Sequence, residues 1–152
     1  IVAEKNLVKK FTLMKQTVDV HSDNLTQHII AKYLEDFNID DHIAKIRETY
    51  RRREGIMMDA IEKYFPKNAK YSHPEGGLFI WVEVPGVDTQ TLFNTCIDHD
   101  VAFVPGEPFY ADKVIPGTFR LNYSNMQDDK IVTGIERLGN AIKETISKQV
   151  EV

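Results

Sequence analysis

The hydrophobic pattern of this chain of 152 residues changes its period at Pro66. Before that proline, apolar residues recur every three or four positions, which is the spacing of one face of an α-helix. After it, apolar and polar residues alternate in short runs bounded by glycine and proline, as is typical of strands. The chain is therefore predicted to begin with helices and to continue as a unit that mixes strands and helices.

Three helices are expected in the first part of the chain. One covers part of residues 8–15, and the next is expected to start at a cap formed by Asn24, with Gln27 reaching back to it. A long third helix should follow, capped by Asp40 or Asp41. Its apolar positions at helical spacing are Ile43, Ile46, Tyr50, Met57, Ile61 and Phe65.

The long helix carries three consecutive arginines, Arg51, Arg52 and Arg53. Their simplest interpretation is a solvated helix face with nearby acidic partners such as Glu48 and Glu54. A nucleic-acid patch is the less favoured alternative, because the net charge is −4 and no basic arm is present. No nucleic-acid partner is expected.

From residue 70 onward the predicted order is strand, strand, helix, strand, strand, helix. The strands are expected at residues 69–72, 78–84, 101–104 and 118–124, and the helices after Asp88 and from about Asp128. This order predicts the α/β class, as a two-layer small domain with a mixed, mostly antiparallel sheet and helices on one face. The long helix precedes that domain.

Cysteine, histidine and hydropathy exclude several classes of protein. The single cysteine, Cys96, rules out an internal disulfide framework and fits a reducing, cytoplasmic compartment. It falls on the apolar face of a helix without a general base, so a buried, inert thiol is expected. No apolar run approaches membrane-spanning length. No metal site is expected, because no ligand spacing joins His21, His28, His42, His73 and His99.

The candidate functional residue is Arg120, which lies between Phe119 and Leu121 in the strand at 118–124. A guanidinium in a strand core is costly unless something pairs with it. Its planar fork matches a carboxylate through two parallel hydrogen bonds. The residue alone leaves two alternatives open, a structural ion pair and a receptor for an anionic ligand.

Three motifs in a fixed order give Arg120 its context: residues 74–82, residues 101–110 and residues 120–124. Separately, they read as a glycine pair turning into a strand, a Pro-Gly pair ending a strand, and an arginine beside an acid. Together they resemble the C-terminal part of fold-type I, pyridoxal-phosphate-dependent aminotransferases of class I/II. Within that group they are most similar to the 2-aminoadipate and kynurenine aminotransferase branch, which also supplies the effector domain of MocR-type regulators.

The resemblance covers nearly the whole chain and implies a domain organisation. Residues 1–38 would be the tail end of the large cofactor domain with its connecting helix, and residues 39–152 the small domain with the long interdomain helix. Residues 50–53 resemble the family's tyrosine-arginine stretch in that helix. Residues 1–3 resemble the strand just after the cofactor-lysine segment. The chain is therefore expected to be a fragment of a longer protein.

The resemblance also implies a role for Arg120, which matches the arginine that grips the α-carboxylate of the amino-acid substrate. Such a clamp would orient the α-carbon over the cofactor. Asn122 could hydrogen-bond nearby or could simply be a polar residue at the end of the strand. Residues 105–110 would shape the edge of the substrate pocket. The parent enzyme would be a homodimer that exchanges an amino group between an amino acid and a 2-oxo acid.

The family's cofactor lysine lies before the strand matched by residues 1–3, and no lysine here replaces it. The nearest ones, Lys5, Lys9, Lys10 and Lys15, are read as solvated, so no catalytic or cofactor-binding residue is assigned. The fragment alone is predicted to bind no pyridoxal 5'-phosphate and to be inactive. Two alternatives remain: the effector-sensing domain of a MocR-type transcription regulator, and a stand-alone α/β ligand-binding module.

Overall fold

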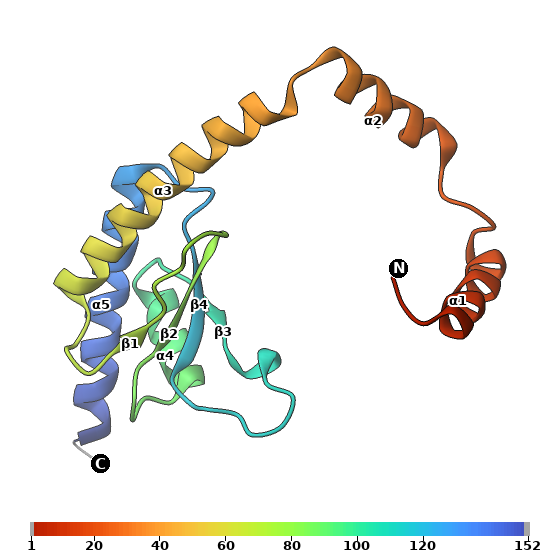
Figure 1. Cartoon of the computed structure of the whole chain (residues 1–152). Coiled ribbons are helices and arrows are strands. Elements are labelled where there is room, and N and C mark those ends of the chain that lie inside the picture. Colours follow the sequence, from red (N-terminus) through yellow and green to blue (C-terminus); the bar gives the residue numbers. More distant parts are fainter. Residues whose placement is uncertain (1, 151–152) are drawn as a thin grey trace. The chain divides into compact units, whose positions relative to one another are not determined.

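The computed structural model describes residues 2–150 and contains the elements in the expected order. The chain divides into two compact units, Ile1–Ile43 and Ala44–Val152. Along the sequence the elements are α1 (Lys5–Val18), α2 (Asn24–Asp36), α3 (Ile39–Tyr64), β1 (Lys70–Tyr71), β2 (Phe79–Glu83), α4 (Thr89–Asp98), β3 (Val104–Pro105), the 3₁₀ helix η1 (Glu107–Phe109), β4 (Thr118–Asn122) and α5 (Asp128–Val150) (Figure 1).

The first unit consists of α1, α2 and the start of α3, and neither α1 nor α2 has a buried residue. The predicted cap of α2 is wrong by one position. The carboxylate of Asp23 accepts the N–H groups of Leu25 and Thr26, so Asn24 becomes the first helical residue. A similar shift occurs at α3, where the side chain of Asn38, not an aspartate, accepts from the Asp40 N–H at 3.1 Å.

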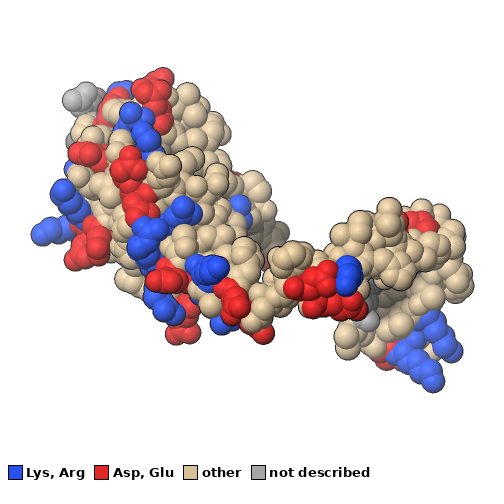
Figure 2. Space-filling view, turned by 90° about the horizontal axis from the view of Figure 1, so that it is seen from above, with Lys and Arg blue, Asp and Glu red and all other residues tan. Residues whose placement is uncertain are grey.

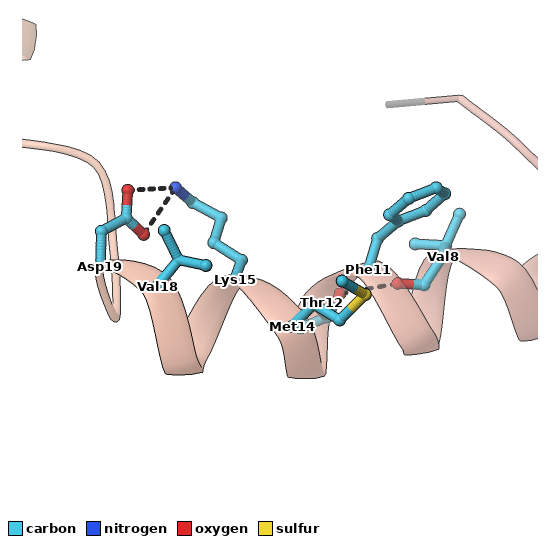
Figure 3. A pocket seen from close by; sticks show the side chains of 7 residues that line it. All are labelled: Val8, Phe11, Thr12, Met14, Lys15, Val18 and Asp19. Carbon is cyan, nitrogen blue, oxygen red and sulfur yellow. Dashed lines mark hydrogen bonds and ion pairs between the residues drawn. The ribbon is translucent and has the colours of Figure 1, made fainter.

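One side of α1 is a shallow apolar hollow (Figure 3). At its end Lys15 forms an ion pair with Asp19 at 2.9 Å. The strand expected at residues 1–3 is not seen: Ile1 lies outside the described residues, and Val2 and Ala3 have no regular secondary structure. The Val2 side chain is fully exposed, and residues 2–3 are not part of the sheet that the structure describes.

The second unit contains a four-stranded sheet in the order β1-β2-β4-β3, and each neighbouring pair is antiparallel. In the central pair, Ile80 lies opposite Leu121 and Val82 opposite Phe119. These four side chains are buried in the core. Because side chains alternate along a strand, the direct neighbours of these residues point to the other face of the sheet. Among these neighbours are Phe79, Trp81 and Arg120.

Helices α3, α4 and α5 cover the buried face of the sheet, and each contributes side chains to a single core. Helices α3 and α5 lie side by side (Figure 1), and they are in close contact at Gly139. A Cβ atom there would lie 2.7 Å from the carbonyl oxygen of Tyr64. The helices therefore form one layer and the sheet the other, which confirms the predicted two-layer α/β architecture.

Strand β3 is shorter than predicted and lies at the edge of the sheet. Residues 101–103 are not in the strand, and Val104 is 43% exposed, whereas Phe103 is buried. Pro105 has no N–H group, so it cannot extend the ladder to a further strand. Helix α4 starts as expected, with Asp88 accepting from the Thr91 N–H at 2.8 Å.

Candidate functional site

Arg120 lies in the middle of β4, opposite Trp81 of β2 and Val104 of β3. Its side chain is on the face of the sheet that the helices leave open. Two aromatic rings lie against the guanidinium. Its Cζ atom is 4.0 Å from the ring centre of Phe79 and 4.7 Å from that of Phe109.

Arg120 has no acidic partner among residues 2–150, since none of the ion pairs includes it. Its Nε atom is buried and makes no hydrogen bond there. A buried donor without a partner costs free energy. Of the two alternatives left open by the sequence, these contacts favour an anion receptor over a structural ion pair.

The motif at residues 105–110 brings Phe109 to Arg120. The Gly106 N–H donates to the carbonyl oxygen of Thr118 at 2.8 Å, and a Cβ atom on Gly106 would lie 2.7 Å from that oxygen. Only glycine therefore fits where β3 ends, and η1 follows directly. Trp81 contacts Phe109 edge-on, with ring centres 5.7 Å apart. It also contacts Tyr110, with ring centres 6.0 Å apart.

Asn122 ends β4 on the same face, and its side-chain oxygen is used within the turn that follows. This oxygen accepts from both the N–H and the hydroxyl group of Ser124, at 2.7 Å each. The contacts fit the simpler of its two interpretations, a polar residue that shapes the end of the strand.

A groove of 740 Å³ runs beside β3 and has Arg120 and Asn122 in its wall. Residues 100–104 and the first half of α5 form its other walls. Two further cations, Lys130 and Arg137, line it, and Arg137 donates to the carbonyl oxygen of Asp100 at 3.2 Å. The sequence did not single out these two cations, because they occupy ordinary polar positions of an amphipathic helix.

The expected partners of the arginine run are wrong. Arg52 and Arg53 face Asp128 at the start of α5, with Arg53 Nε 4.0 Å from its carboxylate. Arg53 also donates to the carbonyl oxygen of Ser124, and its side chain is only 19% exposed. Local helix spacing points to neighbours on the same helix, whereas the packing of α5 on α3 supplies the real partner.

The other features considered from the sequence show no sign of a reactive site among the described residues. Cys96 is fully buried, and burial raises the pKa of its thiol to about 12, which confirms the expected inert cysteine. No group of metal-ligating side chains occurs among the described residues. None of the helices in this part of the chain is long and apolar enough to cross a membrane. Basic and acidic side chains are interspersed on the face seen in Figure 2.

Fold and site together define an α/β domain whose open sheet face carries an arginine flanked by aromatic rings. A family model, aminotransferase class I and II, matches residues 1–138. The chain belongs to the class I and II aminotransferase family, as the motifs around Arg120 predicted.

Two curated aminotransferases are similar over almost the whole chain. Aromatic-amino-acid aminotransferase 1 of Thermococcus litoralis is 39% identical over 149 residues, covering 97% of this chain and 36% of that protein. The 2-aminoadipate transaminase of Thermus thermophilus is 34% identical over 143 residues, covering 93% of this chain and 36% of the relative. The chain thus spans about a third of the length of the curated relatives it matches.

Solved structures agree. The multiple substrate aminotransferase of Thermococcus profundus superposes with a TM-score of 0.88 at 35% identity, covering 96% of this chain and 36% of that one. The α-aminoadipate aminotransferase of Thermus thermophilus, complexed with N-(5'-phosphopyridoxyl)-L-leucine, superposes with a TM-score of 0.86 at 33% identity, covering 96% of this chain and 38% of that one.

An uncharacterized HTH-type transcriptional regulator of Bacillus subtilis is 24% identical over 150 residues, covering 97% of this chain and 30% of the regulator.

Proposed function

We propose that this chain is the C-terminal part of a transaminase that moves an amino group between an amino acid and a 2-oxo acid. The family implies pyridoxal 5'-phosphate as cofactor. When bound, this cofactor supplies the electron sink at the substrate's α-carbon. The observation that carries the proposal is Arg120, a cation on the open sheet face without an acidic partner among the described residues.

The role of Arg120 is to grip the α-carboxylate of the substrate. The guanidinium fork can form two parallel hydrogen bonds with one carboxylate, which fixes both the position and the angle of the bound molecule. An amino acid and a 2-oxo acid both carry this carboxylate. One arginine can therefore hold either reactant in the same orientation.

The described residues do not fit a covalent cofactor site. A lysine that reacts with the cofactor works as a free amine, which is favoured by burial away from water. Every lysine of the chain lies within residues 2–150 and is exposed, and Lys15 is ion-paired with Asp19. We therefore propose that these 152 residues alone hold no cofactor and do not catalyse. A visible absorption band that survives dialysis after mixing with pyridoxal 5'-phosphate would contradict this.

Substitution of Arg120 in the full-length protein tests the carboxylate clamp. Arg120→Gln should lower kcat/KM by about 100- to 1,000-fold, since a charge-assisted bidentate contact is lost, and Arg120→Lys should recover only part of it. The melting temperature should stay nearly unchanged, because among residues 2–150 no acidic side chain is paired with Arg120 and would be left unpaired. Arg51→Lys, an exposed change on α3, is the control. An unaltered kcat/KM in Arg120→Gln would refute the clamp.

The proposal extends to assembly and location. A homodimer is consistent with the apolar side chains that α1 and α2 leave exposed, among them Phe11, Ile29 and Leu34. A cytoplasmic location is consistent with a single, buried thiol. Size-exclusion chromatography with light scattering tests the dimer: a monomer at micromolar concentration would count against it and would favour a stand-alone ligand-binding module.

A second candidate is the effector-sensing domain of a transcription regulator, which the similarity to the Bacillus subtilis protein supports. In that case Arg120 would still bind a carboxylate. The full-length protein would, however, bind a specific DNA sequence and turn over amino acids slowly or not at all. A DNA-binding assay beside a transamination assay separates the two functions.

A further inference from the structure

We propose that Phe79 and Phe109 are positioning residues that hold the Arg120 guanidinium for a carboxylate, an inference that rests on the proposed function. The two rings come from opposite sides of β4. Phe79 belongs to β2, and Phe109 belongs to η1, which follows β3. The Arg120 Cζ atom lies over both rings, 4.0 Å from the ring centre of Phe79 and 4.7 Å from that of Phe109.

Ring contacts take the place of the usual means of fixing an arginine. A functional arginine is commonly held by an acid or a carbonyl oxygen, but the hydrogen bonds and ion pairs among residues 2–150 give the Arg120 Nε atom no partner. Aromatic faces attract the flat, delocalised cation and exclude water from it. Since the N–H bonds of a guanidinium lie in its plane, a carboxylate must approach along an edge that the rings leave free.

Phe109 is itself held in place by the sheet. Trp81 meets it edge-on, with an interplanar angle of 90°, and Trp81 lies directly opposite Arg120 on the neighbouring strand. The close approach of Gly106 to Thr118 fixes where η1 begins. The backbone path from β3 through η1 therefore places the ring of Phe109 against Arg120.

The exposure of the two rings makes the inference testable without unfolding the protein. Phe79 is 38% exposed and Phe109 is 50% exposed, and neither belongs to the buried core. A change to leucine removes the aromatic face and retains an apolar side chain. Such variants should fold, and thermal unfolding checks that they do.

The decisive experiment compares two ligands that differ only in the carboxylate. Binding of L-leucine and of its decarboxylated analogue, 3-methylbutylamine, is measured by absorbance titration of the full-length holoenzyme carrying Phe109→Leu, Phe79→Leu or Phe109→Tyr. Phe109→Leu and Phe79→Leu should each weaken the binding of L-leucine by about 3- to 30-fold, which is the range of a cation–π contact. Their affinity for 3-methylbutylamine should stay within about 2-fold of the wild-type value. Phe109→Tyr, which keeps the ring, should resemble the wild type.

Equal weakening of both ligands would show that the rings support the pocket as a whole, and no weakening would show that they do not position Arg120; either result overturns the inference. Arg120→Gln separates this from failure of the proposed function. If that variant binds L-leucine as well as the wild type does, the carboxylate clamp itself is wrong. If Arg120→Gln selectively weakens the binding of L-leucine and the phenylalanine variants do not, the carboxylate clamp stands and only the positioning role of the two rings is wrong.

Discussion

Single residues of this chain owe their chemistry to how far water reaches them. Cys96 faces the core from α4 and is completely buried, whereas every lysine is exposed. Arg120 lies between these extremes, with its Nε atom buried and aromatic rings against its guanidinium. These contacts make Arg120, the one cation of the β4 strand, the candidate for binding an anion.

The thiol of Cys96 should be unreactive in the folded protein. Burial raises its pKa from an ordinary 9.0 to about 12, which reduces the thiolate at pH 8 by roughly 1,000-fold. Iodoacetamide labelling followed by mass spectrometry should show little modification at pH 8, and normal labelling in strong denaturant. Between pH 9 and 12 the unfolded chain loses this proton first, so stability should fall as the pH rises through that range. Rapid labelling under native conditions would contradict the buried thiol.

At the scale of elements, three helices start directly after an acidic side chain that accepts hydrogen bonds from the first N–H groups of the helix. Asp88 is the clearest case, because the Thr91 N–H and hydroxyl groups each donate to its carboxylate at 2.8 Å. The sequence correctly predicted that a helix starts directly after Asp88. It misplaced the cap of α2, where Asp23 and Asn24 are adjacent and both suit the role.

Removal of the α4 cap should destabilise the second unit. Asp88→Ala should cost about 1 kcal/mol at neutral pH, measured by urea unfolding. The same hydrogen bonds, first that of the Thr91 N–H, hold the pKa of the Asp88 carboxyl below its ordinary value of 3.8. The contribution is therefore complete above that value and disappears as the pH falls below it. Asp88→Asn is the control, since asparagine also caps helices; a loss as large as that of alanine would argue against the cap.

The link between α3 and α5 gives a second prediction for an element. Arg53→Lys should lower the free energy of unfolding by about 1 to 2 kcal/mol, because one ammonium cannot reach both the Ser124 carbonyl oxygen and the Asp128 carboxylate as the fork does. Arg51→Lys, on the same helix but exposed, should change it by less than about 0.5 kcal/mol. Chemical denaturation of both variants makes the comparison, and equal effects would contradict the specific role of Arg53.

At the scale of the whole molecule, the two units differ in how they are held. The second unit has one core fed by three helices and the sheet, whereas α1 and α2 have no buried residue. Helices of 14 and 13 residues are marginal in water without packing. In the 152-residue chain, amide hydrogen exchange should therefore be at least about 100-fold faster in α1 and α2 than in β2, β4 and α5. Equal protection would show that the first unit is packed against something in solution.

The order of elements could be predicted from the sequence because period changes and Pro-Gly stops are local signals. Pairing could not. That β3 joins the sheet beside β4, with only Val104 and Pro105 in the ladder, depends on how α4 returns the chain to the sheet. Likewise, the Asp128 partner of Arg53 and the ring contact of Phe109 with Arg120 join segments that are distant in sequence. The place of Arg120 in a strand could be predicted, because its apolar neighbours Phe119 and Leu121 are a local signal, whereas its role stays a prediction.

The antiparallel pairing of β2 with β4 has a consequence for synthesis of the protein. Translation produces β2 first, and its ladder partner follows only after α4, β3 and a loop have been made. Until β4 leaves the ribosome, Ile80 and Val82 have only the two-residue β1 beside their strand. A nascent chain paused before residue 118 would thus display an open strand edge, the kind of surface that chaperones bind and that aggregates recruit. Strand β4, which carries Arg120, is therefore also the strand that covers this open edge and ends the period of exposure.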